Sequence, residues 1–170
     1  TGPAILSSAL IKDIPDQQPL MILSADHLIE KSKLFIKEIK KKKKYLSSKN
    51  IFIFGIKPTE PSRNYGYFIS NKDKLKKVIK FIEKPNEKKA KKIIIQKGYW
   101  NSGIVLARKD SIINNAKKEQ KKLFSSCLAS ITKSKFRNNT IILNNKFFNK
   151  IKAISFDCAI LEKAKQINSI

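Results

Sequence analysis

The chain has 170 residues, 41% of them hydrophobic, and no apolar run approaching the ~18 residues of a membrane span, so we expect one domain and no membrane partner. Its net charge of +24 suggests a nucleic-acid partner, but only three of the 37 basic residues are arginine, the residue that reads base edges. Lys, Ile and Asn share A/T-rich codons, so we favour genome drift toward such codons as the cause of the positive charge. The two cysteines, Cys127 and Cys158, lack CxxC spacing and are typical of reduced thiols in the cytoplasm.

Helix-like and strand-like patterns alternate through the first half of the chain. Pro3 suits the first turn of a helix, and short apolar runs such as PLMILSADH are typical of strands buried on both faces. We expect, in chain order, a helix from Pro3, a short strand within 19–27, a helix over 28–48, a strand over 50–56, and strands within 66–70 and 75–85.

The second half continues the alternation. Asn86 can cap a helix that Gly98 stops, and the apolar stretch YWNSGIVLA then predicts a strand over 99–107. A helix is expected over 109–129 and a short one over 156–164, whereas 131–154 is ambiguous. Strands separated by helices indicate an α/β fold with a mostly parallel sheet.

Two aspartates occupy positions where such a sheet places ligands. Asp26 follows the first buried strand, and Asp157 begins the last predicted helix. Ligands bind beyond the carboxyl ends of the strands, and two carboxylates at that edge could hold one Mg²⁺ between phosphates. The alternative for each aspartate is a helix cap.

Polar residues at strand ends add further candidates. In FIEKP, Glu83 could accept sugar hydroxyls and Lys84 could face a phosphate, the alternative being an exposed ion pair. In NYGYF, Gly66 would let a ligand approach the main chain, unless the stretch is only a strand entry. In YWNSGIV, the Asn101 amide offers a donor and an acceptor to a diol, whereas Trp100 suits core packing.

Six stretches taken in order resemble the signatures of one family, the bacterial mannose-1-phosphate guanylyltransferases: TGPAI, ILSADHLI, FGIKPTEPSRNYGYF, FIEKPN, GYWNSGIVLA and SFDCAILEK. The stretches YWNSG and NYGY are the most specific. The resemblance implies a nucleotide-sugar transferase fold with a Rossmann-like mixed, mostly parallel sheet. It also implies an enzyme that converts GTP and α-D-mannose 1-phosphate into GDP-mannose and diphosphate.

The resemblance also implies roles for individual residues. By similarity, Asp26 and Asp157 would hold a catalytic Mg²⁺, and Lys84 would face the phosphate. Glu83 and Asn101 would bind the mannose hydroxyls.

The other implied substrate contacts lie in two stretches. Tyr65 and Gly66 belong to the sugar-binding stretch NYGY, with Gly66 offering its backbone to the sugar. Thr1 and Pro3 fall in the segment near the guanine base.

The family's Gly-rich phosphate loop and its C-terminal β-rich region have no counterpart in these residues. We therefore expect 1–170 to be a partial nucleotidyltransferase domain, with a sheet incomplete at its N-terminus and negligible activity alone. A complementing N-terminal chain or a homo-oligomer is the expected protein partner. The alternative functions are another sugar-1-phosphate nucleotidyltransferase, such as a glucose-1-phosphate thymidylyltransferase, and a basic nucleic-acid-binding module.

Overall fold

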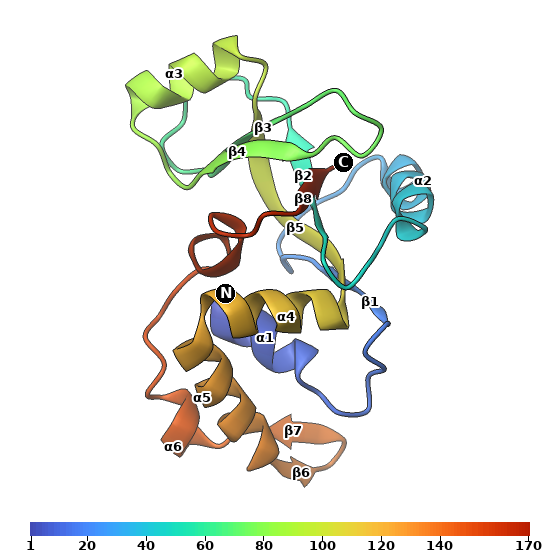
Figure 1. The fold of residues 1–170 in the computed structure, drawn as a ribbon, viewed down its shortest axis with the longest axis vertical. Coiled ribbons are helices and arrows are strands. Elements are labelled where there is room, and N and C mark those ends of the chain that lie inside the picture. Colours follow the sequence, from blue (N-terminus) through green and yellow to red (C-terminus); the bar gives the residue numbers. More distant parts are fainter.

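The computed structural model describes all 170 residues, which form a six-stranded sheet, a two-stranded sheet and several helices (Figure 1). The helices are α1 (Gly2–Ala9), α2 (Ser32–Lys43), α3 (Glu87–Ile95), α4 (Lys109–Glu119), α5 (Lys121–Thr132), α6 (Asn145–Phe148) and the π-helical turn η1 (Asp157–Leu161). The strands are β1 (Pro19–Ile22), β2 (Ile51–Ile56), β3 (Tyr67–Ser70), β4 (Val78–Ile82), β5 (Tyr99–Arg108), β6 (Lys135–Arg137), β7 (Thr140–Ile142) and β8 (Ile167–Ser169). None of the helices combines the length and the apolar character needed to cross a membrane.

Strand β5 is the centre of the large sheet. The order is β4-β3-β5-β2-β8, and β1 also pairs with β5. β2 runs along one edge of β5, whereas β1 pairs with its residues 105–108 and β3 with its residues 99–100. The far edge of β5 is thus shared by two strands, and a short stretch between them has no strand beside it.

The α/β class is confirmed, but the sheet is mainly antiparallel, which corrects the expected parallel arrangement. β5 is antiparallel to β1, β2 and β3, and β3 is antiparallel to β4. Only β2 and β8 run parallel. A continuous apolar run indicates a strand buried on both faces, and such a run carries no information on the direction of its neighbours.

The two central strands separate two hydrophobic cores. Ile51 and Ile53 of β2 face the larger core, which α1, α4, α5 and η1 close. The alternate residues Phe52 and Phe54 face a smaller core under α2, where the ring of Phe35 lies 5.0 Å from that of Phe54. Figure 1 shows α1, α4 and α5 grouped below the sheet and α2 to its right. Burial on both faces explains why the sequence of these strands is continuously apolar.

Helix α3 follows its sequence signals closely. The Asn86 side chain accepts a hydrogen bond from the Lys89 N–H at 2.9 Å and caps the first turn. At the other end, Lys97 adopts a left-handed φ of 58°, and the Gly98 N–H donates to the Ile93 carbonyl at 2.9 Å. This Schellman-type ending differs from the expected one, because lysine rather than glycine takes the left-handed position.

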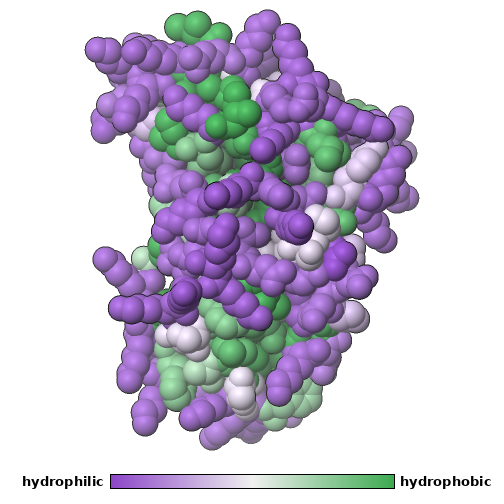
Figure 2. Space-filling view, viewed as in Figure 1, coloured by the Kyte–Doolittle hydropathy of each residue, from purple (hydrophilic) through white to green (hydrophobic).

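Other boundaries differ from the predicted ones. The helix expected over 28–48 begins at Ser32, so Asp26 does not cap it. The helix expected over 109–129 divides at Gln120 into α4 and α5, and the ambiguous stretch contains the β6–β7 hairpin and α6. The short strand β8 was not predicted. Figure 2 shows hydrophilic side chains spread over most of the visible face, with hydrophobic areas near its upper and lower ends.

Candidate functional site

A bulge in β5 forms the floor of the candidate site. Between the pairs Ile53↔Val105 and Gly55↔Asn101, β2 advances two residues while β5 advances four. Within this bulge, Gly103 has a φ of 75° and its N–H donates to Asn101 Oδ1 at 3.3 Å. Asn101 and Gly103 are residue types that form strands poorly, and here they serve a bulge, a feature often found beside active sites.

Four of the predicted site residues come together around this bulge. The Asn101 N–H donates to the Gly66 carbonyl at 2.7 Å, and the Asn101 side-chain amide donates to Asp157 Oδ1. A Cβ added to Gly66 would lie 2.5 Å from Glu83 Oε2 and 3.5 Å from Asn101 Cβ. Residues from the ends of β3 and β4, from β5 and from η1 thus share one small volume. Their roles in binding stay predictions.

The two acidic members of this group are partly buried. Burial raises the pKa of Asp157, while hydrogen bonds from its own backbone and from Asn101 lower it. Burial also raises the pKa of Glu83, and the nearby charge of Asp157 adds to that effect. Glu162 raises the pKa of both groups, and Lys84 lowers that of Glu83. Interacting carboxyl groups with raised pKa values are typical of functional sites.

The turn that carries Asp157 is π-helical. The Glu162 N–H donates to the Asp157 carbonyl at 2.9 Å, which is the i→i+5 bond of such a turn. Asp157 is its first residue and makes no cap hydrogen bond, so the capping alternative is wrong. At the other end, Glu162 accepts a hydrogen bond from the Glu83 N–H at 3.2 Å. Sequence reasoning missed Glu162, because no signal in the sequence marks this turn as π-helical.

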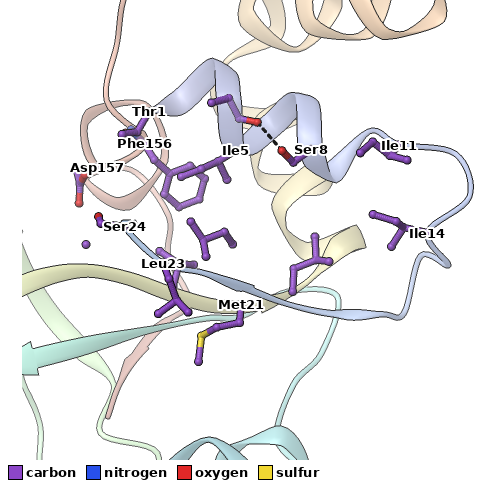
Figure 3. Close-up of a pocket in the computed structure, with 15 residues that line it drawn as sticks. Thr1, Ile5, Ser8, Ile11, Ile14, Met21, Leu23, Ser24, Phe156 and Asp157 are labelled. Carbon is purple, nitrogen blue, oxygen red and sulfur yellow. Dashed lines mark hydrogen bonds between the residues drawn. The ribbon is translucent and has the colours of Figure 1, made fainter. Parts of the chain in front are cut away.

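A cleft of about 520 Å³ opens beside Asp157 (Figure 3). Its walls are mainly apolar and come from α1, the following loop and β1, and Gly103 and Asp157 also line it. Figure 3 shows Thr1, Ser24 and Asp157 toward one end and Ile11 and Ile14 toward the other. The cleft therefore has a polar end next to the four-residue group and a long apolar side.

Only one of the two predicted base-side residues lines the cleft. Thr1 lines it, and its Oγ1 accepts a hydrogen bond from the Phe156 N–H at 3.0 Å, next to Asp157. Pro3, in the first turn of α1, lines a second hollow with Phe148 and Ile151, which Thr1 also borders. The structure thus brings Thr1, but not Pro3, to the candidate site.

The remaining predicted residues lie on the surface around this group. Tyr65 is 46% exposed, and its ring lies 4.8 Å from that of Trp100, which packs against Tyr67 as expected of a core residue. Lys84 is exposed with a φ of 44°, and it forms no ion pair with Glu83, so that alternative is wrong.

Asp26 lies in an exposed turn after β1 and makes neither a side-chain hydrogen bond nor an ion pair, so no such contact links it to the group. No three His, Cys, Asp or Glu side chains are grouped so that they could hold a metal ion. The expected convergence of Asp26 and Asp157 on one cation stays a prediction.

Known proteins resemble the chain over nearly its whole length. Residues 1–146 match the family model described as Nucleotidyl transferase. The chain is 34% identical to the mannose-1-phosphate guanylyltransferase of Escherichia coli, covering 97% of this chain and 38% of that protein. It is 29% identical to the alginate biosynthesis protein AlgA of Pseudomonas fluorescens, covering 98% of this chain and 36% of that protein. The chain thus spans little more than a third of the length of these relatives.

Two solved structures share the fold. A Helicobacter pylori structure titled mannose-6-phosphate isomerase matches with a TM-score of 0.86 and 24% identity, over 100% of this chain and 67% of that one. A Thermus thermophilus structure titled mannose-1-phosphate geranyltransferase matches with a TM-score of 0.80 and 19% identity, over 100% of this chain and 49% of that one. Both matches support the mixed α/β architecture described above.

Proposed function

The chain belongs to the nucleotidyl transferase family, and we propose that it forms the sugar-phosphate site of a mannose-1-phosphate guanylyltransferase. In the proposed reaction, a phosphate oxygen of α-D-mannose 1-phosphate attacks the α-phosphorus of GTP. The bond between that phosphorus and the oxygen bridging to the β-phosphate breaks, and diphosphate leaves. Because the protein forms no covalent intermediate, its task is to position both phosphates and to neutralise charge.

The observation that carries this proposal is the grouping of Gly66, Glu83, Asn101 and Asp157. A sugar ring presents neighbouring hydroxyl groups that need both donors and acceptors. The Glu83 carboxylate would accept from such hydroxyls, and the Asn101 amide would exchange hydrogen bonds with them. Gly66 leaves the space beside the Glu83 carboxylate free, so that a hydroxyl can approach it.

The residues present fit a Mg²⁺ ion bound mainly by substrate phosphates. Such an ion needs only one or two protein carboxylates, and Asp157 supplies oxygen ligands at the polar end of the cleft. We propose Asp157 as its main protein ligand and Asp26 as the second. When bound, the ion would neutralise phosphate charge, and the exposed ammonium of Lys84 would attract the same phosphates.

The cleft suggests how the nucleotide side of the site is completed. β1 pairs with β5 only, so its other edge is free, and the apolar wall of the cleft lies beside it. A free edge next to apolar surface favours the binding of another polypeptide segment. We propose that a complementing chain or a second copy covers this edge, and that GTP binds near Thr1. The free thiols Cys127 and Cys158 favour a reducing compartment such as the cytoplasm.

Titration calorimetry with the 170-residue chain tests the proposal. We expect saturable binding of mannose 1-phosphate in the presence of Mg²⁺, weaker binding of glucose 1-phosphate, and little binding of inorganic phosphate. Glu83→Gln should weaken sugar-phosphate binding, whereas the matched variant Glu87→Gln, on the exposed side of α3, should not. Equal heats for inorganic phosphate and for mannose 1-phosphate would show that the site does not recognise the sugar. Preference for glucose 1-phosphate would favour the thymidylyltransferase-like alternative.

A further inference from the structure

Glu162 connects the two sides of the candidate site. Its Oε1 accepts a hydrogen bond from the Glu83 N–H at 3.2 Å, although the residues are 79 positions apart. Its own N–H donates to the Asp157 carbonyl at 2.9 Å. One residue is therefore bonded both to the end of β4 and to the turn that carries Asp157.

The Glu83 N–H lies where the backbone has no strand partner, so the hydrogen bond from it to Glu162 can fix the position of the chain. The last pair in the β3–β4 ladder is Tyr67↔Ile82, so Glu83 lies just beyond the ladder. The next residue, Lys84, has a left-handed φ of 44°, which turns the chain sharply. The Glu83 N–H lies at the surface, where water can also satisfy it, but only a contact from the protein fixes the position of this segment. The Glu162 side chain supplies that contact.

The π-helical turn allows this contact. In a turn closed by an i→i+5 bond, the sixth residue follows the first by slightly more than one turn, so Asp157 and Glu162 can both face the end of β4. The turn is itself held, because the Gln120 side chain donates to the Ala159 carbonyl at 3.1 Å. Gln120 lies where α4 and α5 divide, so the helical layer fixes the turn from behind.

We propose that Glu162 is a positioning residue, which holds the Glu83 backbone so that the Glu83 carboxylate points toward the bound sugar. The inference rests on the proposed function for its ligand, mannose 1-phosphate. The essential feature is the reach and acceptor capacity of the side chain. Its negative charge is not required, because an amide oxygen accepts the same hydrogen bond.

Three substitutions separate these properties. Glu162→Gln keeps the side-chain length and the hydrogen-bond acceptor but removes the charge. Glu162→Asp keeps the charge but shortens the side chain, and Glu162→Ala removes the length, the acceptor and the charge together. The matched control is Glu30→Ala, because Glu30 is exposed and has no hydrogen bond or ion pair. Circular dichroism and urea unfolding establish that each variant is folded.

Two measurements on each variant test the inference. The first is the proton shift and exchange rate of the Glu83 amide by NMR, and the second is the affinity for mannose 1-phosphate by calorimetry. We expect Glu162→Ala and Glu162→Asp to move the amide shift, to speed its exchange, and to weaken binding by roughly three- to tenfold, the range of one hydrogen bond. Glu162→Gln should restore both properties to near the original values.

The outcomes distinguish this inference from the proposed function. If the unchanged chain does not bind mannose 1-phosphate, the proposed function fails, while the amide measurements still decide whether Glu162 holds Glu83. If the unchanged chain binds and the alanine variant matches it in amide shift, exchange and affinity, the positioning role is wrong. If glutamine behaves like alanine, the charge rather than the hydrogen bond is responsible, which also overturns the inference.

Discussion

Replacing Gly66 by alanine tests the geometry of the site most sharply. The added Cβ would lie 2.5 Å from Glu83 Oε2, but 3.4 Å from Phe81 Cζ and 3.5 Å from Asn101 Cβ. Only Gly103 among the glycines has a positive φ, so the backbone at position 66 accepts alanine without strain. The Glu83 carboxylate is therefore the group that must move.

The size of the effect follows from what Glu83 would lose. A hydrogen bond to a charged group contributes about 1.5–3 kcal/mol, which corresponds to about a 10- to 100-fold change in Kd. We expect Gly66→Ala to weaken mannose 1-phosphate binding by a factor in this range, measured by calorimetry. Its free energy of unfolding in urea should change by less than about 1 kcal/mol, because a flexible side-chain end can move away at little cost.

A double-mutant cycle identifies the cause. Glu83→Ala removes the atom that the new methyl group would meet, so Gly66→Ala should have no further effect on affinity in that background. The proposed contact between Gly66 and Glu83 is refuted if Gly66→Ala binds mannose 1-phosphate as tightly as the original chain. It is also refuted if the losses of affinity from the two substitutions multiply, because Gly66 would then act independently of Glu83.

Three further predictions concern pKa values and stability. Asn101→Ala should raise the pKa of Asp157 further, because it removes a hydrogen bond that lowers it, and an unchanged carboxyl titration by carbon NMR would contradict this. Burial raises the pKa of Asp157 above 3.8 and that of Glu83 above 4.5 in the folded chain. Both carboxyl groups therefore bind a proton more tightly in the folded chain than in the unfolded chain. The unfolding free energy of the original chain relative to Asp157→Asn should therefore decrease as pH rises from below 3.8 through the raised pKa. If urea unfolding shows that this difference increases with pH, the prediction is wrong. Lys97→Gly should stabilise the chain by about 1 kcal/mol, because glycine adopts the left-handed conformation of this position without strain. Lys92→Gly inside α3 should instead destabilise the chain by about 1 kcal/mol. If both substitutions lower the free energy of unfolding, the left-handed conformation of Lys97 is wrong.

Local signals in the sequence predicted the parts of the fold that depend on neighbouring residues. The burial of Ile51–Phe54 on both faces of the sheet and the cap at Asn86 both follow from short stretches of chain. The direction of strand pairing does not, because β5 lies between strands from distant parts of the sequence. The three-residue strand β8 was missed because it is too short to show a period, and it depends on its pairing with β2.

The site shows the same division. Three site residues were predicted because each borders an apolar run and belongs to a residue type that is uncommon in strands: Gly66, Glu83 and Asn101. Glu162 was missed because the stretch reads as an ordinary helix, in which a residue five positions from Asp157 faces elsewhere. Only the π-helical closure and the contact with Glu83 reveal it, and both depend on tertiary structure.

Mapping mannose 1-phosphate on the chain by NMR, with Mg²⁺ present, decides whether the four-residue group binds the sugar phosphate. We expect the largest saturable changes at the backbone amides of Gly66, Glu83, Asn101 and Asp157. Changes confined to the lysine-rich helix α2, or none at millimolar ligand, would contradict it.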